Sequence, residues 1–281
     1  MVYFLFGLWI DSDITLPTAG SIFLMRPSVD VVIREGMTPD QLEQRLSPTS
    51  EAFGEEGKLL FSVPTIGRFL IEDGRRITYQ KDPDLTESES IRLFLLGSCM
   101  GALLQQRGVI VLHGNAVSMD GKTCSIFVGD SGAGKSTMAA WHYRKGSLIL
   151  ADDVVAIVFN EAGDPMVIPS FPQIKLWQAS ADLLGISTDG LKRVRPQDEK
   201  YSLPIMAQFC RSTLPILEVV EILKEPGQVK SYTGVEKLGL LQLHSYRYSF
   251  LGLMGIQNAY LAGLVRLAGK VLVRSCERVK I

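Results

Sequence analysis

The sequence is poor in cysteine, and the few cysteines that it has are scattered. Four occur in 281 residues, and no two of them form a CxxC pair: Cys99, Cys124, Cys210 and Cys276. This spacing argues against a zinc site and against a disulfide framework. A reducing compartment, the cytoplasm, is therefore the expected location.

An excess of charge of either sign is also missing. The 29 basic and 30 acidic residues give a formal net charge of -1, and neither sign is gathered into a block. The overall charge therefore does not favour nucleic acid as a partner. The sequence leaves a homo-oligomer open.

Hydrophobic runs long enough to cross a membrane are scarce. Residues 1–10 are apolar but lack the basic start and the cleavage site of a signal peptide, and a buried strand is expected there. Residues 248–265 carry no charge, yet Gln257, Asn258 and several glycines and alanines interrupt them. Because a bilayer span needs about 20 predominantly apolar residues, we expect a buried helix here and no membrane partner.

The apolar pattern changes near residue 86, which predicts two domains. Before this point, short apolar runs at 3–9, 29–33, 58–63, 69–71 and 76–79 are separated by Gly, Pro, Asp and Ser. Such runs are typical of strands and turns, so residues 1–85 are expected to form a small β-rich N-terminal domain. Residues 39–46 are predicted as a short helix, because Thr38 can cap it and Asp40 and Glu43 suit its first turns.

Residues 86–281 mix helical and strand patterns, which predicts an α/β second domain. Thr86 and Glu89 have capping-box spacing and open a helical apolar pattern over 87–106. Apolar runs then predict strands at 109–112, 123–128, 148–151 and 154–159, with a helix at 135–144. Weaker patterns predict strands at 164–168 and 216–223, a helix at 174–184 and a long C-terminal helix at 246–276.

One run has the spacing GxxxxGK[ST], and it stands where a strand is expected to lead into a helix. Its residues are Gly129, Asp130, Ser131, Gly132, Ala133, Gly134, Lys135 and Ser136, followed by Thr137. Glycines at this spacing let consecutive backbone N–H groups turn toward phosphate oxygens. We expect ATP here, with Lys135 on its β and γ phosphates and the Ser136 hydroxyl on Mg²⁺. A chance glycine-rich turn is the alternative, against which the flanking strand and helix argue.

Two acidic residues and a histidine follow apolar runs near this motif. Asp152 and Asp153 come directly after the run 148–151. Neighbouring side chains on a strand point to opposite faces, so we expect divided roles, one carboxylate for Mg²⁺ and one for a proton. His113 follows the run 109–112 and would reach the γ-phosphate if that strand neighbours the motif. The alternatives are an exposed acidic turn and a structural histidine, the reading that also suits His142 and His244.

Basic residues further along the chain are weaker candidates. Lys192, Arg193, Arg195 and Lys200 lie close together in a Pro- and Asp-containing loop. They could contact phosphates or an acidic peptide, although a solvated charged loop is the simpler interpretation. Lys175 is a second candidate of this kind. The aromatic segment 244–250 could line a peptide groove or belong to the core.

Three phrases together resemble the catalytic domain of bacterial HPr kinase/phosphorylase: VLHGNAV at 111–117, VGDSGAGKST at 128–137 and LADDV at 150–154. The resemblance implies a P-loop core related in shape to phosphoenolpyruvate carboxykinase, over residues 86–281. It places His113 on the family's active-site histidine, Lys135 on its P-loop lysine and Asp153 on the aspartate that serves as base for a serine hydroxyl. Asp152 is left as a magnesium ligand beside Ser136.

Two departures from that family bear on the reaction. Thr137 replaces the glutamate that usually follows the P-loop serine, and the LEIRGLG segment, whose glutamate helps to hold Mg²⁺, is replaced by IPSFPQIKLW at 168–177. Dephosphorylation by the reverse reaction is therefore not expected.

The altered segment and the β-rich N-terminal region are similar to the HPr-kinase-like enzymes of lasso-peptide pathways. Those kinases phosphorylate the C-terminal serine of a precursor peptide, so a precursor peptide or a small protein is the substrate that the resemblance implies. An HPr-type kinase/phosphorylase, a small-molecule kinase and a non-catalytic nucleotide-binding regulator remain the alternatives.

Overall fold

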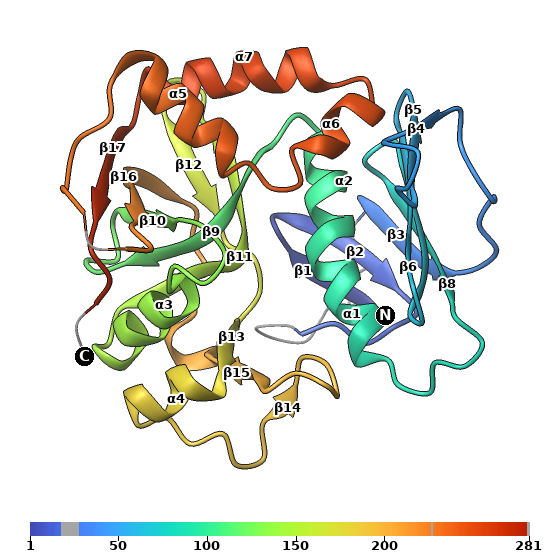
Figure 1. Cartoon of the computed structure of the whole chain (residues 1–281), viewed down its shortest axis with the longest axis horizontal. Helices are drawn as coiled ribbons and strands as arrows, with labels where there is room; N and C mark the ends of the chain where they lie inside the picture. The colour runs from blue at the N-terminus through green and yellow to red at the C-terminus, as the bar shows by residue number, and fades with distance from the viewer. Residues whose placement is uncertain (18–27, 226, 280–281) are drawn as a thin grey trace. The chain divides into compact units, whose positions relative to one another are not determined.

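The structure is a computed structural model that describes residues 1–17, 28–225 and 227–279. The chain is mixed α/β and divides into two compact units (Figure 1). The first comprises Met1–Ile110 and Arg247–Ala262, and the second comprises Val111–Tyr246 and Gly263–Ile281. This division differs from the predicted boundary at 85/86. Helices at 89–106 and 249–253 belong to the first unit, because they bury their apolar side chains against its sheet.

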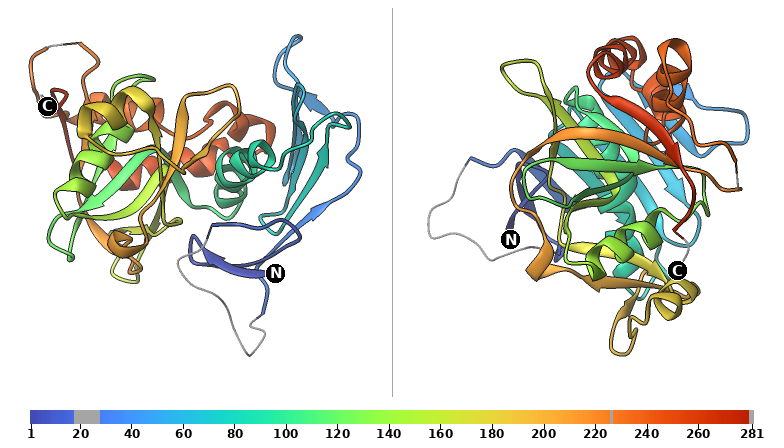
Figure 2. Two further views of the ribbon diagram at one scale, coloured as in Figure 1. Left: turned by 90° about the horizontal axis from the view of Figure 1, so that it is seen from below. Right: turned by 90° about the vertical axis from the view of Figure 1, so that its left-hand side faces the viewer.

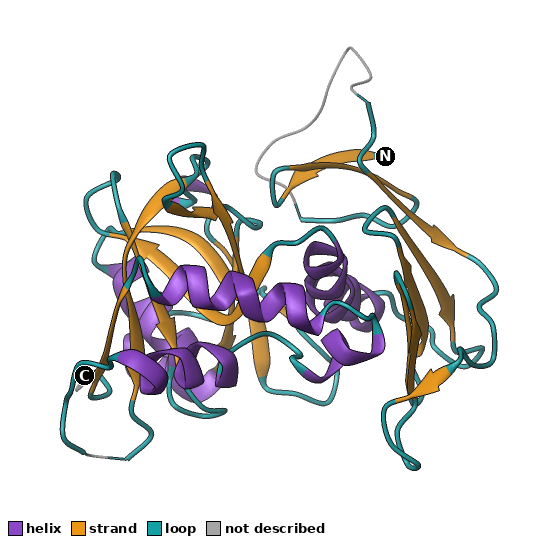
Figure 3. Cartoon of the chain, turned by 90° about the horizontal axis from the view of Figure 1, so that it is seen from above, coloured by secondary structure: helices purple, strands orange, loops and turns teal. Residues whose placement is uncertain are grey.

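The first unit is built on one sheet of eight strands in the order β1-β2-β3-β8-β7-β6-β5-β4. The strands predicted at 29–33, 58–63, 69–71 and 76–79 are present, and helices cover one face of this sheet (Figure 3). The single strand expected over residues 1–10 is wrong in part, because Phe6 and Gly7 have positive φ and turn the chain into a hairpin of β1 and β2. The bounds are β1 Val2–Leu5, β2 Leu8–Ser12, β3 Val31–Glu35, β4 Gln44–Arg45, β5 Ala52–Glu55, β6 Lys58–Val63, β7 Gly67–Glu72 and β8 Arg76–Lys81.

The helix predicted over 87–106 is confirmed, with an internal π-helical segment. It runs as α1 Glu89–Phe94, the π segment η1 Leu95–Cys99 and α2 Met100–Gln106. Its buried side chains include Ile91, Leu95 and Leu103, all fully inaccessible to solvent. The expected Thr86 and Glu89 capping box does not form, since the Ser90 N–H instead donates to the Glu87 carboxylate, 2.9 Å away.

A short helix, α6 Ser249–Leu253, packs against β5 and β6 of the same unit. The contact depends on Gly54, because a Cβ at that position would lie 2.4 Å from the Leu253 carbonyl oxygen. Atoms this close cannot coexist without a backbone shift. The glycine therefore allows the helix to approach the strand.

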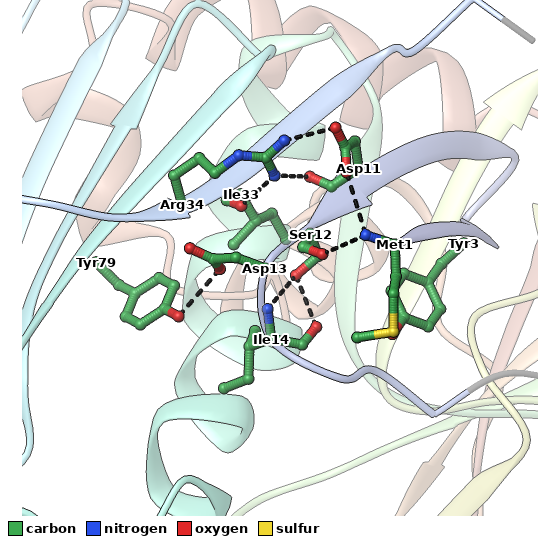
Figure 4. Close-up of polar contacts among 9 residues, drawn as sticks. All are labelled: Met1, Tyr3, Asp11, Ser12, Asp13, Ile14, Ile33, Arg34 and Tyr79. Carbon is green, nitrogen blue, oxygen red and sulfur yellow. Dashed lines mark hydrogen bonds and ion pairs between the residues drawn. The ribbon is translucent and has the colours of Figure 1, made fainter. Parts of the chain in front are cut away.

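Polar and charged side chains join the neighbouring strands β2, β3 and β8 (Figure 4). Arg34 donates to the Asp11 carboxylate and, at 2.9 Å, to the Asp11 carbonyl, and this pairing lowers the pKa of Asp11. The Tyr79 hydroxyl donates to Asp13 at 3.0 Å. The strands are thus linked by side chains as well as by backbone hydrogen bonds.

The helix predicted at 39–46 is wrong, because residues 39–43 have no regular secondary structure and Gln44–Arg45 form β4. Gln44 and Arg45 pair with Gly54 and Phe53 of β5. Helices as short as this are marginal in water without packing. The open edge of β5 supplies the backbone partners that the isolated helix would lack.

The second unit contains a six-stranded sheet in the order β10-β9-β11-β12-β16-β17, with a further pairing of β10 and β16 that closes five strands into a ring. The strands predicted at 109–112, 123–128, 164–168 and 216–223 are confirmed. The bounds are β9 Ile110–Ser118, β10 Cys124–Val128, β11 Leu148–Phe159, β12 Pro165–Ile168, β16 Leu214–Ile222 and β17 Leu272–Cys276.

Helix α3 Lys135–Arg144 matches its prediction and packs on β10, β11 and β13 Gln173–Trp177. Its buried Met138 and Ala139 meet Phe127 and Ile149 in the core of this unit. Helix α5 Gly234–Leu243 lies on the other side of the sheet (Figures 1 and 2). The strand β13 also pairs with β15 Lys200–Pro204, which pairs with β14 Lys192–Arg193 to form a small third sheet.

Two predicted helices are wrong in part. The segment 246–276 is not one helix but α6, α7 Gln257–Ala268 and β17, because Gly255, with φ 72°, interrupts the first part and β16 offers β17 a parallel partner. The segment 174–184 begins as β13 and becomes helix α4 Gln178–Leu184 only at residue 178. None of the helices in the described ranges is both long and apolar enough to cross a membrane.

Candidate active site

The glycine-rich run joins β10 to α3, as the sequence pattern predicts. Gly129, Gly132 and Gly134 have φ of 149°, 78° and 100°, a region that side chains with a Cβ rarely enter. A Cβ on Gly129 would also lie 2.8 Å from the Ile222 carbonyl oxygen. These three positions therefore require glycine for the loop to keep its shape.

Lys135 is the first residue of α3, and its side chain turns back over the loop. Its Nζ donates to the carbonyl oxygens of Gly129 at 2.8 Å and Asp130 at 3.1 Å. Burial lowers the pKa of Lys135, while the carboxylates of Asp153 and Asp152 oppose this shift. The ammonium and the two aspartates are thus close enough to interact electrostatically.

The start of α3 presents backbone N–H groups without a side-chain cap. Gly134 is the N-cap residue and offers no capping side chain, so the N–H groups of Lys135, Ser136 and Thr137 have no intrahelical acceptor. The Thr137 hydroxyl is engaged elsewhere, 2.8 Å from the Ser180 hydroxyl. A helix start of this kind favours an anion.

Asp152 and Asp153 do not follow the end of a strand, as was predicted, but lie in the middle of β11. Asp153 has φ 76°, a left-handed conformation that costs about 1 to 3 kcal/mol and is found at functional sites more often than elsewhere. This residue breaks the alternation of the strand. Both carboxylates contact the same neighbouring residue, one through its backbone N–H and the other through its side chain, and the expectation that they point to opposite faces stays a prediction.

That neighbour is Lys175, on β13. Its side chain is 9% exposed, and its Nζ lies 2.8 Å from Asp153 Oδ2. Its backbone N–H donates to Asp152 Oδ2 at 2.7 Å. From the sequence, Lys175 was only a weak candidate, because the sequence does not show that β13 lies beside β11.

The two aspartates differ in their electrostatic environment. Burial, and after it the negative charge of Asp153, raise the pKa of Asp152. Burial would also raise the pKa of Asp153, but the positive charge of Lys175 and the contact with His113 hold it well below its usual range. Asp153 is therefore ionised at neutral pH, and the pKa values of the two carboxyls are shifted in opposite directions.

His113 is on β9, which pairs with β10, so the strand that carries this histidine does neighbour the glycine-rich loop. Its Nδ1 lies 3.2 Å from Asp153 Oδ1, a close contact that lacks the angle of a regular hydrogen bond. Its backbone N–H donates to the His244 carbonyl oxygen at 2.7 Å. The ring is 41% exposed and is therefore accessible to a substrate.

A magnesium ion would need oxygen ligands from the chain and from a substrate. No group of three His, Cys, Asp or Glu side chains in the described part of the chain is arranged to hold a metal ion. Asp152 has one carboxylate oxygen bonded to Lys175, and Ser136 supplies a hydroxyl at the start of α3. Mg²⁺ commonly takes one or two carboxylates and completes its shell with phosphate oxygens and water, and Ser136 and Asp152 supply oxygen donors of the kind that this ion takes.

One of the four clustered basic residues, Lys200, acts electrostatically on residues of the site. It contributes to the lowered pKa of Lys135 and opposes the raised pKa of Asp152. Lys192 and Arg193 form the exposed strand β14, and Arg193 donates to the Pro196 carbonyl at 3.0 Å. The exposure of these two residues agrees with the interpretation of the cluster as a solvated charged segment.

Sequence reasoning missed two residues that hold the loop. Asn115 Nδ2 donates to the Lys135 carbonyl at 2.6 Å, and its buried Oδ1 has no hydrogen-bond partner within the described ranges. Arg278 donates to the Gly132 carbonyl at 3.0 Å. Asn115 could have been found, because it is two residues after His113 on the same strand face. Nothing in the sequence indicates that Arg278 returns to the loop.

Glu221, Tyr232 and His244 form a polar cluster near the loop. Of these three residues, His244 was interpreted from the sequence as structural. His244 Nε2 is 3.5 Å from Glu221 Oε1, and the Tyr232 hydroxyl donates to the other oxygen of that carboxylate. Burial lowers the pKa of His244, on which Asp130 and Lys135 also act. Burial and this hydrogen bond raise the pKa of Tyr232 to about 12. The cluster therefore links Glu221 of β16 to His244, the residue that follows α5.

No protein-family model matches the sequence, and no curated protein matches it. Among solved structures, the chain is similar to the HPr(Ser) kinase/phosphatase from Coxiella burnetii. The sequence identity is 10% and the TM-score 0.32, over 60% of this chain and 85% of that one.

Proposed function

We propose that this chain is an ATP-dependent serine kinase that acts on a peptide. The observation that carries the proposal is the meeting, in one unit, of an anion-binding helix start with an ionised carboxylate. Lys135 lies at the helix start, and the carboxylate is that of Asp153, which is flanked by His113 and Lys175. Binding a nucleotide without transfer would require the helix start but not the carboxylate.

The loop would bind the phosphates of ATP through the uncapped N–H groups of α3 and the ammonium of Lys135. Phosphate oxygens would replace the carbonyl oxygens of Gly129 and Asp130 as its acceptors. Interactions with a charged donor are about twice as strong as neutral hydrogen bonds. Positioning and electrostatics of this kind supply most of the catalysis in phosphoryl transfer.

Asp153 would orient the attacking serine hydroxyl. Its low pKa makes it a weak base in the ground state, so it first accepts a hydrogen bond from the hydroxyl. It accepts the proton only as the bond between the serine oxygen and the γ-phosphorus forms. The bond between the γ-phosphorus and the bridging oxygen breaks in the same step, and ADP leaves with that oxygen. Lys175 keeps the carboxylate charged and fixes one of its oxygens. His113, on the other oxygen, is accessible to the substrate.

Ser136 and Asp152 would hold Mg²⁺ together with phosphate oxygens. The bound ion neutralises negative charge on the phosphates during transfer. The Asp152 carboxyl is held in place by the Lys175 backbone N–H, which leaves its second oxygen for this purpose.

The acceptor and the direction of the reaction are further parts of the proposal. The C-terminal serine of a ribosomally made, lasso-type precursor peptide is the substrate suggested by the sequence resemblance. The family segment that carries the magnesium glutamate is replaced in this chain by a segment that contains Lys175, and the ammonium of Lys175 pairs with Asp153. A second cation site beside that aspartate would have to compete with a fixed ammonium, so we propose transfer in the forward direction only.

A cytoplasmic location is also part of the proposal. Cys99, Cys124, Cys210 and Cys276 are free thiols, which suits a reducing compartment.

The proposal is tested by incubating the purified chain with ATP, Mg²⁺ and peptides that end in serine, alanine or threonine, followed by mass spectrometry. One added phosphoryl group on the serine peptide, less on threonine and none on alanine is expected. Asp153→Asn should keep ATP binding and lower the rate by about 10² to 10⁴, since asparagine tolerates the left-handed backbone. Asp164→Asn, an exposed acid outside the site, is the matched control.

ATP binding without transfer to any peptide would favour the regulatory alternative. A phosphopeptide incubated with the enzyme, Mg²⁺ and excess phosphate should remain phosphorylated for hours. Its rapid dephosphorylation would return the chain to the bifunctional kinase/phosphorylase class.

A further inference from the structure

The first unit contains a pocket that the proposed chemistry does not use. Its volume is about 280 Å³, and four segments of the chain line it: the turn between β4 and β5, strand β6, the α1–η1 helix and the start of α6. Every lining residue belongs to the first unit. For comparison, a cavity of roughly 150 Å³ is large enough to bind benzene.

The floor of the pocket is apolar and consists of buried aromatic side chains. Phe61, Phe94 and Phe250 line it and are 5%, 9% and 7% exposed. The rings of Phe61 and Phe250 stack with their centroids 5.8 Å apart. Aromatic side chains held in this way offer a preformed surface for another apolar group.

The rim is polar and carries one unneutralised charge. Arg247 lines the pocket and is exposed, and no carboxylate in the described part of the chain lies within ion-pair distance of it. Its guanidinium carbon lies 5.9 Å from the centre of the Phe250 ring. Glu51, the acid on the rim, is already paired with Arg45 at 3.1 Å. A ligand with a carboxylate would therefore meet a free guanidinium.

Two departures from regular backbone geometry occur at the same place. Arg247 has φ 48°, although it is not glycine. Ser98, 4% exposed, lies in the π-helical segment η1, which follows Phe94 directly. Single turns of π-helix are frequent at functional sites, because the extra residue redirects a side chain. Ser98 and Arg247 both line the pocket.

From this geometry we infer that the pocket binds a peptide segment in which an aromatic or large aliphatic side chain stands next to a carboxylate. The apolar side chain lies against the three phenylalanines, and the carboxylate pairs with Arg247. A planar guanidinium suits a carboxylate because it can donate two parallel hydrogen bonds. If the chain is a peptide kinase, as proposed above, this pocket is a docking site for its substrate outside the catalytic residues.

The binding step can be tested without the kinase reaction. N-acetyl-L-phenylalanine and its amide differ only in the carboxylate, and their binding to the full chain is measured by saturation-transfer NMR titration. We expect the acid to bind about tenfold more tightly than the amide, the effect of one charge-assisted hydrogen bond pair. Equal binding of the two probes, or binding of neither, would overturn the inference, and this comparison needs no variant.

Variants then locate the site. Arg247→Gln should reduce binding of the acid to the level of the amide, whereas Arg247→Lys should retain most of it. Arg76→Gln removes an exposed arginine on β8 and is the matched control, expected to bind like the unaltered chain. Ser62→Trp, which adds a large side chain at the pocket wall, should abolish binding of both probes. Unchanged binding of the acid to Arg247→Gln or to Ser62→Trp would place the site elsewhere and refute the proposal.

The kinase assay separates this inference from the proposed function. With a peptide that the enzyme phosphorylates, Arg247→Gln should raise the KM for the peptide about tenfold and leave the KM for ATP and kcat unchanged. Loss of kcat at normal KM would count against a docking role. If no peptide is phosphorylated but the probes bind as described, the pocket stands and the kinase proposal fails.

Discussion

Replacing Lys175 by methionine should destabilise the protein more than most single substitutions in the second unit. The change keeps the length of an unbranched side chain and removes an ammonium that lies 2.8 Å from Asp153 Oδ2. The Lys175 side chain is 9% exposed and that of Asp153 is 25% exposed. The variant therefore leaves a largely buried carboxylate without its main partner.

The magnitude follows from the cost of an uncompensated buried charge. Removing one partner of a buried ion pair costs about 3 to 5 kcal/mol. Asp153 keeps some contact with solvent and with His113 Nδ1 at 3.2 Å, so we expect the lower end, about 3 kcal/mol. At roughly 2 to 4 °C per kcal/mol for a chain of this size, the midpoint of thermal unfolding should fall by about 6 to 12 °C.

The pH dependence has a definite sign. Lys175 and His113 hold the folded-state pKa of Asp153 below its usual value, which is about 3.9 in an unfolded chain. The stabilisation is therefore fully present above the unfolded pKa and is lost as the pH falls through the folded one. The difference in unfolding free energy between the original protein and Lys175→Met should be full at pH 7 and shrink below about pH 4.

The measurement is urea unfolding of the original protein, Lys175→Met, Asp153→Asn and the double variant, which completes a double-mutant cycle. The double variant should be more stable than Lys175→Met alone, because no buried charge remains unpaired. Lys175→Arg, which keeps the charge, is the control. A loss under about 1 kcal/mol in Lys175→Met, or simple addition of the two single effects, would refute the reasoning.

Three further predictions concern the loop and the first unit. Lys135→Met should abolish phosphoryl transfer and weaken ATP binding, measured by calorimetry, because the loop loses its fixed positive charge; full turnover would remove the nucleotide assignment. Ser136→Ala should weaken ATP binding more with Mg²⁺ than without it, and equal losses in the two titrations would contradict its metal role. Gly54→Ala should lower the unfolding free energy by about 1 to 3 kcal/mol, since its Cβ would meet the Leu253 carbonyl at 2.4 Å. The matched control is Gly239→Ala in α5, where nothing lies within 4 Å of the new Cβ and helix propensity should stabilise by up to about 1 kcal/mol.

Local chemistry was sufficient to predict the elements around the loop. The apolar run before Gly129 and the helical run after Lys135 correspond to β10 and α3. The required glycines were recognisable because their conformations depend on the residue itself, with φ positive at Gly132 and Gly134. The helix over 89–106 was predictable for a similar reason, since its apolar side chains recur at helical spacing.

Predictions failed where a distant partner decided the conformation. Residues 272–276 continue an apolar pattern that suits a helix, but β16 offers them parallel hydrogen bonds and they form β17. Residues 44–45 pair with β5 in the same way. The backbone donors and acceptors that a neighbouring strand supplies are not encoded in the periodicity of the segment itself.

The sequence by itself determined which chemical groups are available: a glycine-rich loop with Lys135 and Ser136, two adjacent carboxylates and a histidine after an apolar run. The tertiary structure alone decided the surroundings of the carboxylates. It turns Asp153 into a left-handed conformation within β11, and it brings Lys175 from β13 to within 2.8 Å. The charge state of Asp153 depends on that contact, because the pKa of a buried carboxyl responds to the charges around it and not to its neighbours along the chain.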